Sequence, residues 1–160
     1  MNVLNRKLVA YFSATGITAR IANLLADSID ADIFEITPAI PYTKADLDWK
    51  DDNSRSSIEM QTDSARPEIS HTRENMTEYS TIYLGFPIWW YTAPKIINTF
   101  LESYDFSGKT IIPFATSGGS GMEHAPDSLR ASCPNATVFS GAVIPGSATL
   151  QDLDKWTEEN

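Results

Sequence analysis

Short apolar segments alternate along this chain with segments that have the 3.6-residue apolar periodicity of a helix. The apolar segments predict strands at residues 8–12, 32–36, 81–86, 110–115 and 136–139, the last with an extension to 143. The periodic segments predict helices at residues 17–28, 94–104, 122–131 and 150–158. Parallel strands need a crossover between them, and a helix usually supplies it. The sequence therefore predicts an α/β fold, a three-layer sandwich with helices on both faces of a parallel sheet.

A turn of small and hydroxyl residues joins the first predicted strand to the first predicted helix. It comprises Ser13, Ala14, Thr15, Gly16, Ile17 and Thr18. The first amides of a helix have no intrahelical acceptor and the helix dipole is positive there, so such a turn can hold a phosphate. The turn contains no lysine or arginine, so the donors would be neutral. Ordinary N-cap chemistry uses the same residue types, and the turn alone leaves both interpretations open.

Two further loops follow the third and fourth predicted strands. The first contains Pro87, Ile88, Trp89, Trp90 and Tyr91, and the second contains Thr116, Ser117, Gly118, Gly119, Ser120 and Gly121. Three successive aromatic residues cannot all point into the core, so at least one is expected to face solvent or a flat ligand, although one tryptophan can cover the sheet edge. The glycine-rich loop exposes backbone groups suited to the polar edge of a ring, unless it is simply a flexible connection.

In open parallel sheets, ligands bind beyond the carboxyl ends of the strands. All three loops follow strands, so we expect them to meet at that one edge. A phosphate turn, an aromatic platform and a backbone-rich loop together predict a site for a phosphorylated, flat, partly polar ligand. FMN fits this description.

The chain resembles flavodoxins and flavodoxin-like proteins, which carry Phe-Ser-Ala-Thr-Gly early and Gly-x-Pro-Ile-Trp-Trp in the middle. These motifs are residues 12–16 and 85–90 here, and the likeness covers essentially the full length, as a single domain of residues 1–160. The resemblance implies a five-stranded parallel sheet in the order 2-1-3-4-5, one FMN bound without a covalent link, and electron transfer through it. It also implies that residues 13–18 wrap the phosphate, that residues 87–90 flank the ring, and that residues 116–121 close its other side.

The chain departs from the flavodoxin pattern at two positions. Ile17 stands where many flavodoxins have asparagine, so one side-chain contact with the phosphate is expected to be missing. Tyr91 stands where many have a glycine whose peptide turns over near the flavin. A residue other than glycine reaches positive φ less readily, so the redox potentials do not follow from the resemblance.

Composition and charge limit the function classes. The chain has 12 Lys and Arg against 21 Asp and Glu, a net charge of −9. This balance disfavours nucleic acid and anionic membranes as partners and favours redox proteins with basic surfaces, although acidity also serves solubility alone. One cysteine, Cys133, excludes an internal disulfide and fits a reducing compartment. With no apolar signal segment before the first strand, the sequence predicts a cytoplasmic protein, with a monomer favoured.

Other chemistries lack their motifs. The first turn carries neither the Gly-x-x-x-x-Gly-Lys-Ser/Thr phosphate loop nor the Gly-x-Gly-x-x-Gly dinucleotide fingerprint, and no His, Cys or carboxylate cluster has metal-ligand spacing. We interpret Cys133 as structural. A lone histidine is more often a surface residue than a catalytic one, so we interpret His124 as a surface residue. Two functions remain: a diffusible low-potential electron carrier, and an FMN-dependent NAD(P)H:quinone-type oxidoreductase. The paired tryptophans suggest a covered ring, which favours the carrier.

Residues 39–77 interrupt the alternation of strands and helices. This segment, the excursion below, is polar and rich in turn residues, and it contains one plausible short helix at residues 54–61. Long irregular segments in compact domains are commonly functional or poorly ordered. Trp49 is out of place in such a polar setting, so we hypothesise that the excursion packs back over the ligand, with part of a partner surface as the alternative.

Overall fold

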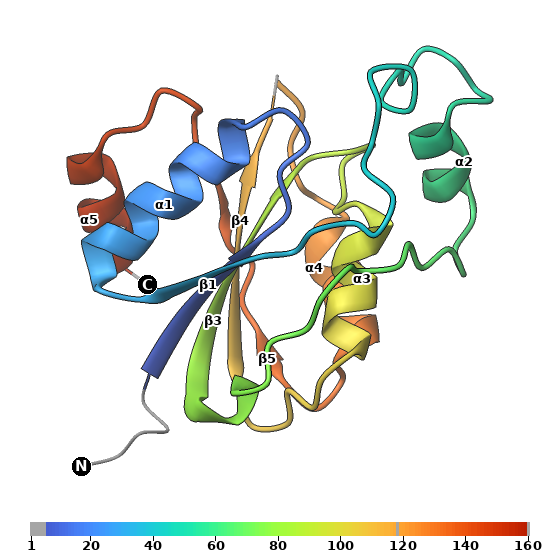
Figure 1. Cartoon of the computed structure of the whole chain (residues 1–160). Coiled ribbons are helices and arrows are strands. Elements are labelled where there is room, and N and C mark those ends of the chain that lie inside the picture. The colour runs from blue at the N-terminus through green and yellow to red at the C-terminus, as the bar shows by residue number, and fades with distance from the viewer. Residues whose placement is uncertain (1–5, 118, 160) are drawn as a thin grey trace.

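A computed structural model describes residues 6–117 and 119–159 of the chain (Figure 1). Its strands are β1 (Arg6–Tyr11), β2 (Asp32–Glu35), β3 (Tyr79–Pro87), β4 (Thr110–Thr116), β5 (Thr137–Val138) and β6 (Ala142–Val143). Its helices are α1 (Ile17–Ile29), α2 (Arg55–Gln61), α3 (Lys95–Glu102), α4 (Ala125–Ser132) and α5 (Leu150–Glu158), with a 3-10 turn at Met76–Glu78. The strands pair in parallel in the order β2-β1-β3-β4-β5, and β6 also pairs with β4. The predicted sheet order and fold class are confirmed.

The sheet separates two apolar layers, and the alternation along its central strands explains why. Leu8 and Ala10 of β1 enter the layer beneath α3 and α4, whereas Val9 and Tyr11 enter the layer beneath α1 and α5. Successive side chains of a strand point to opposite faces, so a continuous apolar strand fills both layers. Figure 1 shows the result, with α1 and α5 on one side of the sheet and α3 and α4 on the other.

The predicted fifth strand is interrupted at residues 139–141, and Pro113 of β4 supplies the reason. The carbonyls of Ile111 and Ala115 accept hydrogen bonds from Phe139 and Ile144, so residue 113 faces the same neighbouring strand. Proline has no amide hydrogen to donate there. The chain therefore bulges by one residue and resumes as β6, which pairs with Phe114 and Ala115. This corrects the continuous strand expected through residue 143.

Helix bounds follow local chemistry. α4 begins at Ala125 rather than at the predicted residue 122, because Pro126 is best placed in a first helical turn. α5 has the predicted bounds and begins with a capping box, in which Thr149 and Asp152 bond to each other's amides. α3 ends at Glu102, two residues before the predicted end, where the amide of Ser103 bonds to Phe100 in a tighter turn.

The excursion leaves the fold and returns to it at one neck. The amide of Ala39 donates to the carbonyl of Glu68 at 2.8 Å, and the amide of Ser70 donates to that of Thr37 at 2.8 Å. Between these points the chain carries α2, which begins after a Ser54 cap and matches the predicted helix at residues 54–61. Figure 1 shows α2 far from the sheet, at the outer end of the molecule. The excursion is thus a closed loop rather than an open connection.

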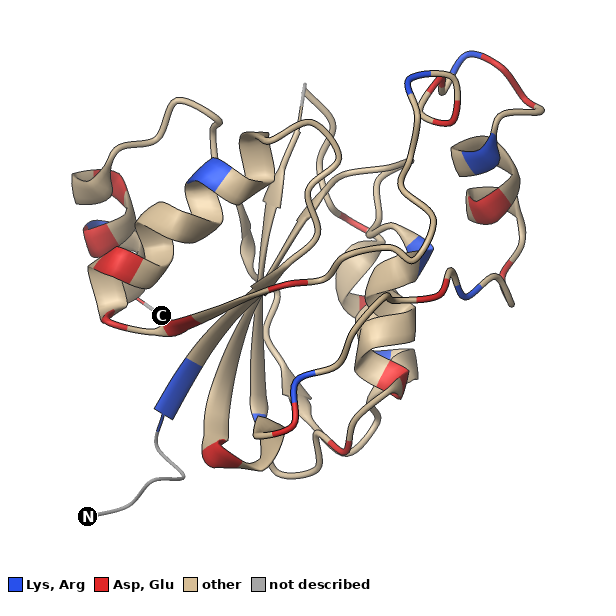
Figure 2. Cartoon of the chain, viewed as in Figure 1, with Lys and Arg blue, Asp and Glu red and all other residues tan. Residues whose placement is uncertain are grey.

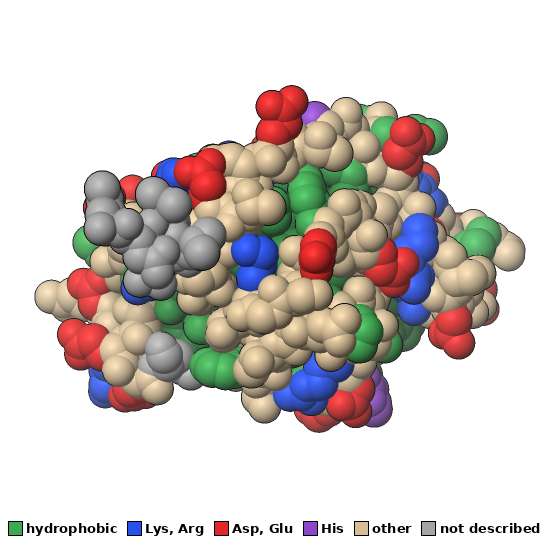
Figure 3. All heavy atoms as spheres, turned by 90° about the horizontal axis from the view of Figure 1, so that it is seen from below, with side chains coloured by type: hydrophobic (Ala, Val, Ile, Leu, Met, Phe, Trp, Pro, Cys, Tyr) green, Lys and Arg blue, Asp and Glu red, His purple; other side chains and the backbone are tan. Residues whose placement is uncertain are grey.

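The edge where the strands begin is tied by an ionic cluster. Asp32, Arg6 and Tyr79 are the first residues of three adjacent strands. The Tyr79 hydroxyl donates to Asp32 Oδ2 at 2.5 Å, and Arg6 pairs with Asp32 and with Glu78. The guanidinium groups of Arg6 and Arg73 lie 5.2 and 5.5 Å from the centre of the Tyr79 ring. Figure 3 views this edge, where acidic, basic and apolar side chains are interspersed.

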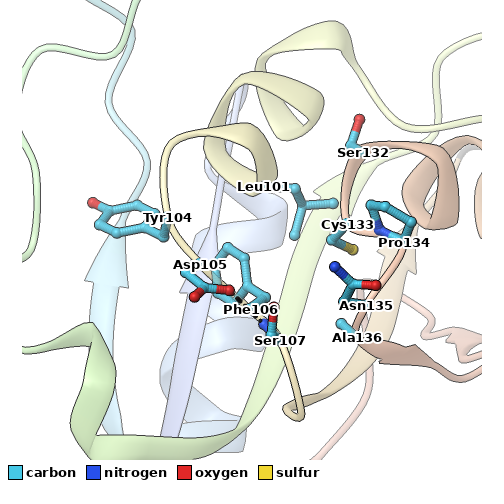
Figure 4. A pocket seen from close by; sticks show the side chains of 10 residues that line it. All are labelled: Leu101, Tyr104, Asp105, Phe106, Ser107, Ser132, Cys133, Pro134, Asn135 and Ala136. Carbon is cyan, nitrogen blue, oxygen red and sulfur yellow. Dashed lines mark hydrogen bonds between the residues drawn. The ribbon is translucent and has the colours of Figure 1, made fainter.

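Near the same edge, a cavity of about 120 Å³ lies between the ends of α3 and α4 (Figure 4). Cys133 lines it, but its thiol is buried and bonds to the carbonyl of Leu129 at 3.2 Å. Burial raises the pKa of this thiol, which disfavours the thiolate. These features give Cys133 a packing role.

Within the described residues, no helix is long and apolar enough to cross a membrane, and no group of three or more metal-ligating side chains is assembled.

Candidate functional site

The hydroxyl turn lies between the end of β1 and the start of α1. Gly16 has a φ of 96°, a left-handed conformation that glycine adopts without strain. A Cβ at this position would meet no atom within 4 Å, so the backbone conformation, and not crowding, explains the glycine. The Ser13 hydroxyl accepts from the amides of Gly16 at 3.0 Å and Ala19 at 3.2 Å. Its own proton therefore remains available for a ligand oxygen.

Thr18 and Thr116 connect the hydroxyl turn to the glycine-rich loop. Both are buried, and their hydroxyl oxygens lie 2.7 Å apart, although they come from α1 and β4. The sequence placed both residues in the site, but not in contact with each other. The geometry gives them a shared role, because the pair holds the two loops in a fixed relation. Only one of the two protons is used by this bond, so the other can still be donated.

Nearby residues of the hydroxyl turn lie differently. Ala14 packs on the core, and the Ile17 side chain is half exposed. Arg20, one turn into α1, donates to the carbonyls of Gly146 and Ala148. Its guanidinium is therefore engaged by a loop near α5. The neutral donor set expected for the turn is retained.

Trp89 belongs to a cluster of three aromatic rings that all contact one another. Its ring lies 5.8 Å from that of Phe12, 89° apart, and 5.5 Å from that of Tyr42, 77° apart, while Phe12 and Tyr42 are 5.6 Å apart. Edge-to-face contacts at such distances are favourable. The three rings come from the segments after β1, β2 and β3. This Phe12–Tyr42–Trp89 cluster therefore joins the hydroxyl turn, the excursion and the aromatic loop.

The next two residues form a strained turn. Trp90 and Tyr91 have φ of 50° and 65°, and Trp89 and Thr92 exchange hydrogen bonds of 3.0 and 3.1 Å across them. Positive φ at both central residues defines a type I′ turn, which normally uses Asn-Gly. The amide of His124, at the start of α4, donates to the Tyr91 carbonyl at 3.1 Å and supports the turn. The conformation presents both large side chains outward, and each is largely exposed.

A cavity of about 490 Å³ opens between the aromatic loop, the glycine-rich loop and the excursion. It is lined by Leu47, Trp49, Ser56, Ile88, Trp89, Trp90, Tyr91, Ser117, Gly119 and Ser120. Six of these residues were predicted to lie at the ring, namely Ile88, Trp89, Trp90, Ser117, Gly119 and Ser120. The cavity is more than large enough for a planar ring, and aromatic faces and backbone groups line it.

Other lining residues were outside the predicted set. Leu47 and Ser56 lie in the polar excursion, where no periodic pattern linked them to a sheet edge. Tyr91 neighbours the predicted residue Trp90 and could have been included on that ground. Trp49 was the one signal, and the structure places it in the cavity wall with 66% of its surface exposed. Whether it covers a ligand stays a prediction.

Two predicted residues, Pro87 and Gly121, have other surroundings. Pro87 ends β3 and pairs with Thr116 in the sheet. Gly121 follows the cavity-lining part of its loop, and a Cβ there would come within 2.3 Å of the Glu123 carboxylate. Gly118 lies outside the described residues. The turn at residues 13–18 lies beside the cavity, joined to it through Thr116 and Phe12, rather than within its wall.

The chain matches the model of the flavodoxin family over residues 6–160. The chain belongs to this family. A candidate flavoprotein from Bacteroides uniformis is 49% identical, covers 96% of this chain and 98% of its own, and superposes with a TM-score of 0.91. One from Bacteroides eggerthii is 42% identical, with 96% of both chains covered and a TM-score of 0.89. None of the curated proteins matches the chain.

A more distant structure carries a ligand. The flavoprotein of Lactobacillus acidophilus, solved in complex with FMN, is 22% identical, covers 96% of this chain and 99% of its own, and has a TM-score of 0.73. At this identity the likeness concerns the fold. The residues of the flavodoxin described here fit FMN on their own chemistry: a neutral hydroxyl turn at a helix start suits a phosphate, and the aromatic cavity suits a flat ring.

Proposed function

We propose that this flavodoxin is a low-potential electron carrier whose redox group is FMN, held without a covalent bond. The observation that carries the proposal is an aromatic cavity between the loops that follow β3 and β4, with the hydroxyl turn that follows β1 directly beside it. The hydroxyl pair and the aromatic cluster lock the hydroxyl turn to that cavity. One ligand with a phosphate at one end and a flat ring at the other satisfies both parts.

The chain's own residues bind and orient the cofactor. The Ser13 hydroxyl accepts bonds from the amides of Gly16 and Ala19, so its own proton would be donated to the phosphate at the start of α1, where the helix dipole favours an anion. Trp89 and Trp90 would limit water at the ring, while Ser117 and the backbone of Gly119 would face its polar edge. When bound, FMN supplies the electron transfer itself, and the surrounding residues tune its potential.

The charge of the protein supports a carrier with basic partners. The chain has a net charge of −9, and an acidic surface raises the rate of encounter with a basic one. Figure 2 shows acidic positions on α1 and α5, where a partner could approach. The single buried cysteine agrees with a reducing compartment, and we infer a cytoplasmic carrier.

An assay separates the carrier from an NAD(P)H:quinone-type oxidoreductase. Photochemically reduced protein should pass electrons to cytochrome c, a basic acceptor, at a rate that falls as salt screens the attraction. The oxidised holoprotein, given NADPH or NADH and a quinone without a separate reductase, should show no turnover above that of free FMN. Substantial turnover in that mixture would identify an enzyme and contradict the carrier proposal.

A further inference from the structure

Tyr42 joins the excursion to the aromatic rings of the ligand loops. Its ring packs on both Trp89 and Phe12, the two aromatic residues that belong to the ligand loops. Tyr42 lies only a few residues beyond the neck that joins the excursion to the sheet. The ring contacts of Tyr42 therefore connect the start of the excursion to the aromatic side chains beside the cavity.

Arg55 and Glu59 of α2 clamp Tyr42 from its other side. The Tyr42 hydroxyl donates to Glu59 Oε1 at 2.5 Å, and Arg55 Nε donates to Glu59 Oε2 at 2.9 Å. The Arg55 guanidinium lies 3.8 Å from the centre of the Tyr42 ring and donates to the carbonyl of Ile40 at 2.7 Å. Burial, followed by the hydrogen bond to Glu59, raises the pKa of Tyr42, which keeps the phenol a donor.

The same clamp reaches the wall of the cavity. The amide of Ser56, next to Arg55, donates to the carbonyl of Asp46 at 3.0 Å, and Arg55 lies 3.9 Å from the Asp46 carboxylate. Asp46 precedes Leu47, and Leu47, Trp49 and Ser56 form the part of the wall that the excursion supplies. Neither Arg55 nor Glu59 lines the cavity.

We propose that Arg55 and Glu59 are positioning residues for the FMN ring. By clamping Tyr42 against Trp89 and holding α2 to the Asp46 turn, they fix the outer wall of the cavity without touching the cofactor. The proposal rests on the proposed FMN function. The clamp is suited to this role because both side chains are well covered, which makes their ion pair stronger than an exposed one.

The test compares Arg55→Met with Arg66→Met. Arg66 belongs to the same excursion and pairs with Glu102 at 3.0 Å, and it donates to the carbonyls of Asp63 and Ala65, so it is a matched arginine outside the clamp. For each purified protein, the Kd for FMN, the residual fluorescence of bound flavin and its midpoint potential are measured. Thermal unfolding of the apoprotein controls for general damage.

Arg55→Met is expected to raise the Kd for FMN roughly tenfold, because a binding wall must be held within about 0.5 Å of its productive position. It should also raise the fluorescence of bound flavin and shift its potential, since the ring meets Trp89 less closely. Glu59→Gln keeps the shape and should give a smaller change in the same direction. It also serves as the second variant if Arg55→Met does not fold. Arg66→Met should leave all three quantities at wild-type values.

Unchanged Kd, fluorescence and potential in folded Arg55→Met or Glu59→Gln would overturn the proposal. Equal losses in Arg55→Met and Arg66→Met would also overturn it, since the effect would then be a general loosening of the excursion. A wild-type protein that binds no FMN would instead contradict the proposed function, and this inference with it. That failure is visible before any variant is made.

Discussion

The two ends of the sheet, where its strands begin and where they finish, differ in how their aromatic side chains are held. Where the strands begin, the Tyr79 ring is fully buried near two guanidinium groups, and its hydroxyl is bonded to Asp32 and Arg73. Where the strands end, large aromatic side chains are exposed around a cavity, and Trp90 and Tyr91 occupy left-handed conformations. Strained, exposed residues cost stability and persist where a ligand needs them. The end where the strands begin is built for stability and the end where they finish for binding.

The largest effect is expected from Trp89→Ala, which removes one ring of the Phe12–Tyr42–Trp89 cluster. FMN affinity should fall by about 2 kcal/mol, or roughly 30-fold in Kd, because an aromatic contact surface is lost. Trp156→Ala is the matched control, since this tryptophan packs on Tyr83 and Phe114 beneath α5. Titration should show its Kd unchanged although its stability falls. Similar Kd values for the two variants would show that Trp89 has no special role in FMN binding.

Tyr79→Phe is expected to lower the free energy of unfolding by about 1–2 kcal/mol, because Asp32 and Arg73 each lose a hydrogen-bond partner. Urea unfolding measures this change. The Kd for FMN should stay at its wild-type value, since Tyr79 lies at the opposite end of β3 from the cavity. A weaker Kd without a loss of stability would mean that the end where the strands begin also serves binding.

Tyr91→Gly should increase stability by about 1 kcal/mol, because glycine adopts positive φ without strain. Thermal unfolding of the apoprotein would show it as a rise of a few degrees in Tm. Tyr91→Ala is the control and should not stabilise, since alanine keeps the same conformational cost. A stabilisation by alanine equal to that by glycine would place the gain in the lost side chain rather than in the turn.

The smallest effect concerns acid stability at the end where the strands begin. The Tyr79 hydrogen bond, with Arg6 beside it, holds the pKa of Asp32 below its ordinary value of 3.8. This contribution to stability is therefore complete above about pH 4 and is lost as pH falls through the lowered pKa. Wild type should exceed Asp32→Asn in Tm at neutral pH, and the difference should shrink in acid. A constant difference across this range would exclude the carboxylate as its source.

The sheet was predictable because its signals are local and repeated. Each central strand is a short apolar run, and alternating strands and helices permit few arrangements. Within residues 136–143, Gly141, which has a φ of 71°, is a local sign of the interruption between β5 and β6, but it does not show the cause. The cause is Pro113 on the neighbouring strand, so the interruption depends on a pairing that the sequence of the fifth strand does not contain.

The candidate site was predictable in part for the same reason. The three loops could be located because each follows a recognisable strand. Side-chain contacts between distant segments could not be: Thr18 pairs with Thr116, and Tyr42 joins Trp89, across long stretches of sequence. Leu47 and Ser56 of the excursion line the cavity. The excursion has no periodic apolar pattern, so its sequence does not indicate which of its residues face the cavity.

Titration of the purified apoprotein with FMN, followed by flavin fluorescence, is the most direct test of FMN binding at the cavity. We expect saturable binding of one FMN at micromolar concentration or below, with strong quenching of the flavin by the adjacent tryptophans. Riboflavin, which has the ring without the phosphate, should bind more weakly, because the hydroxyl turn would have no ligand. No binding at micromolar FMN would show that the three loops do not form an FMN site.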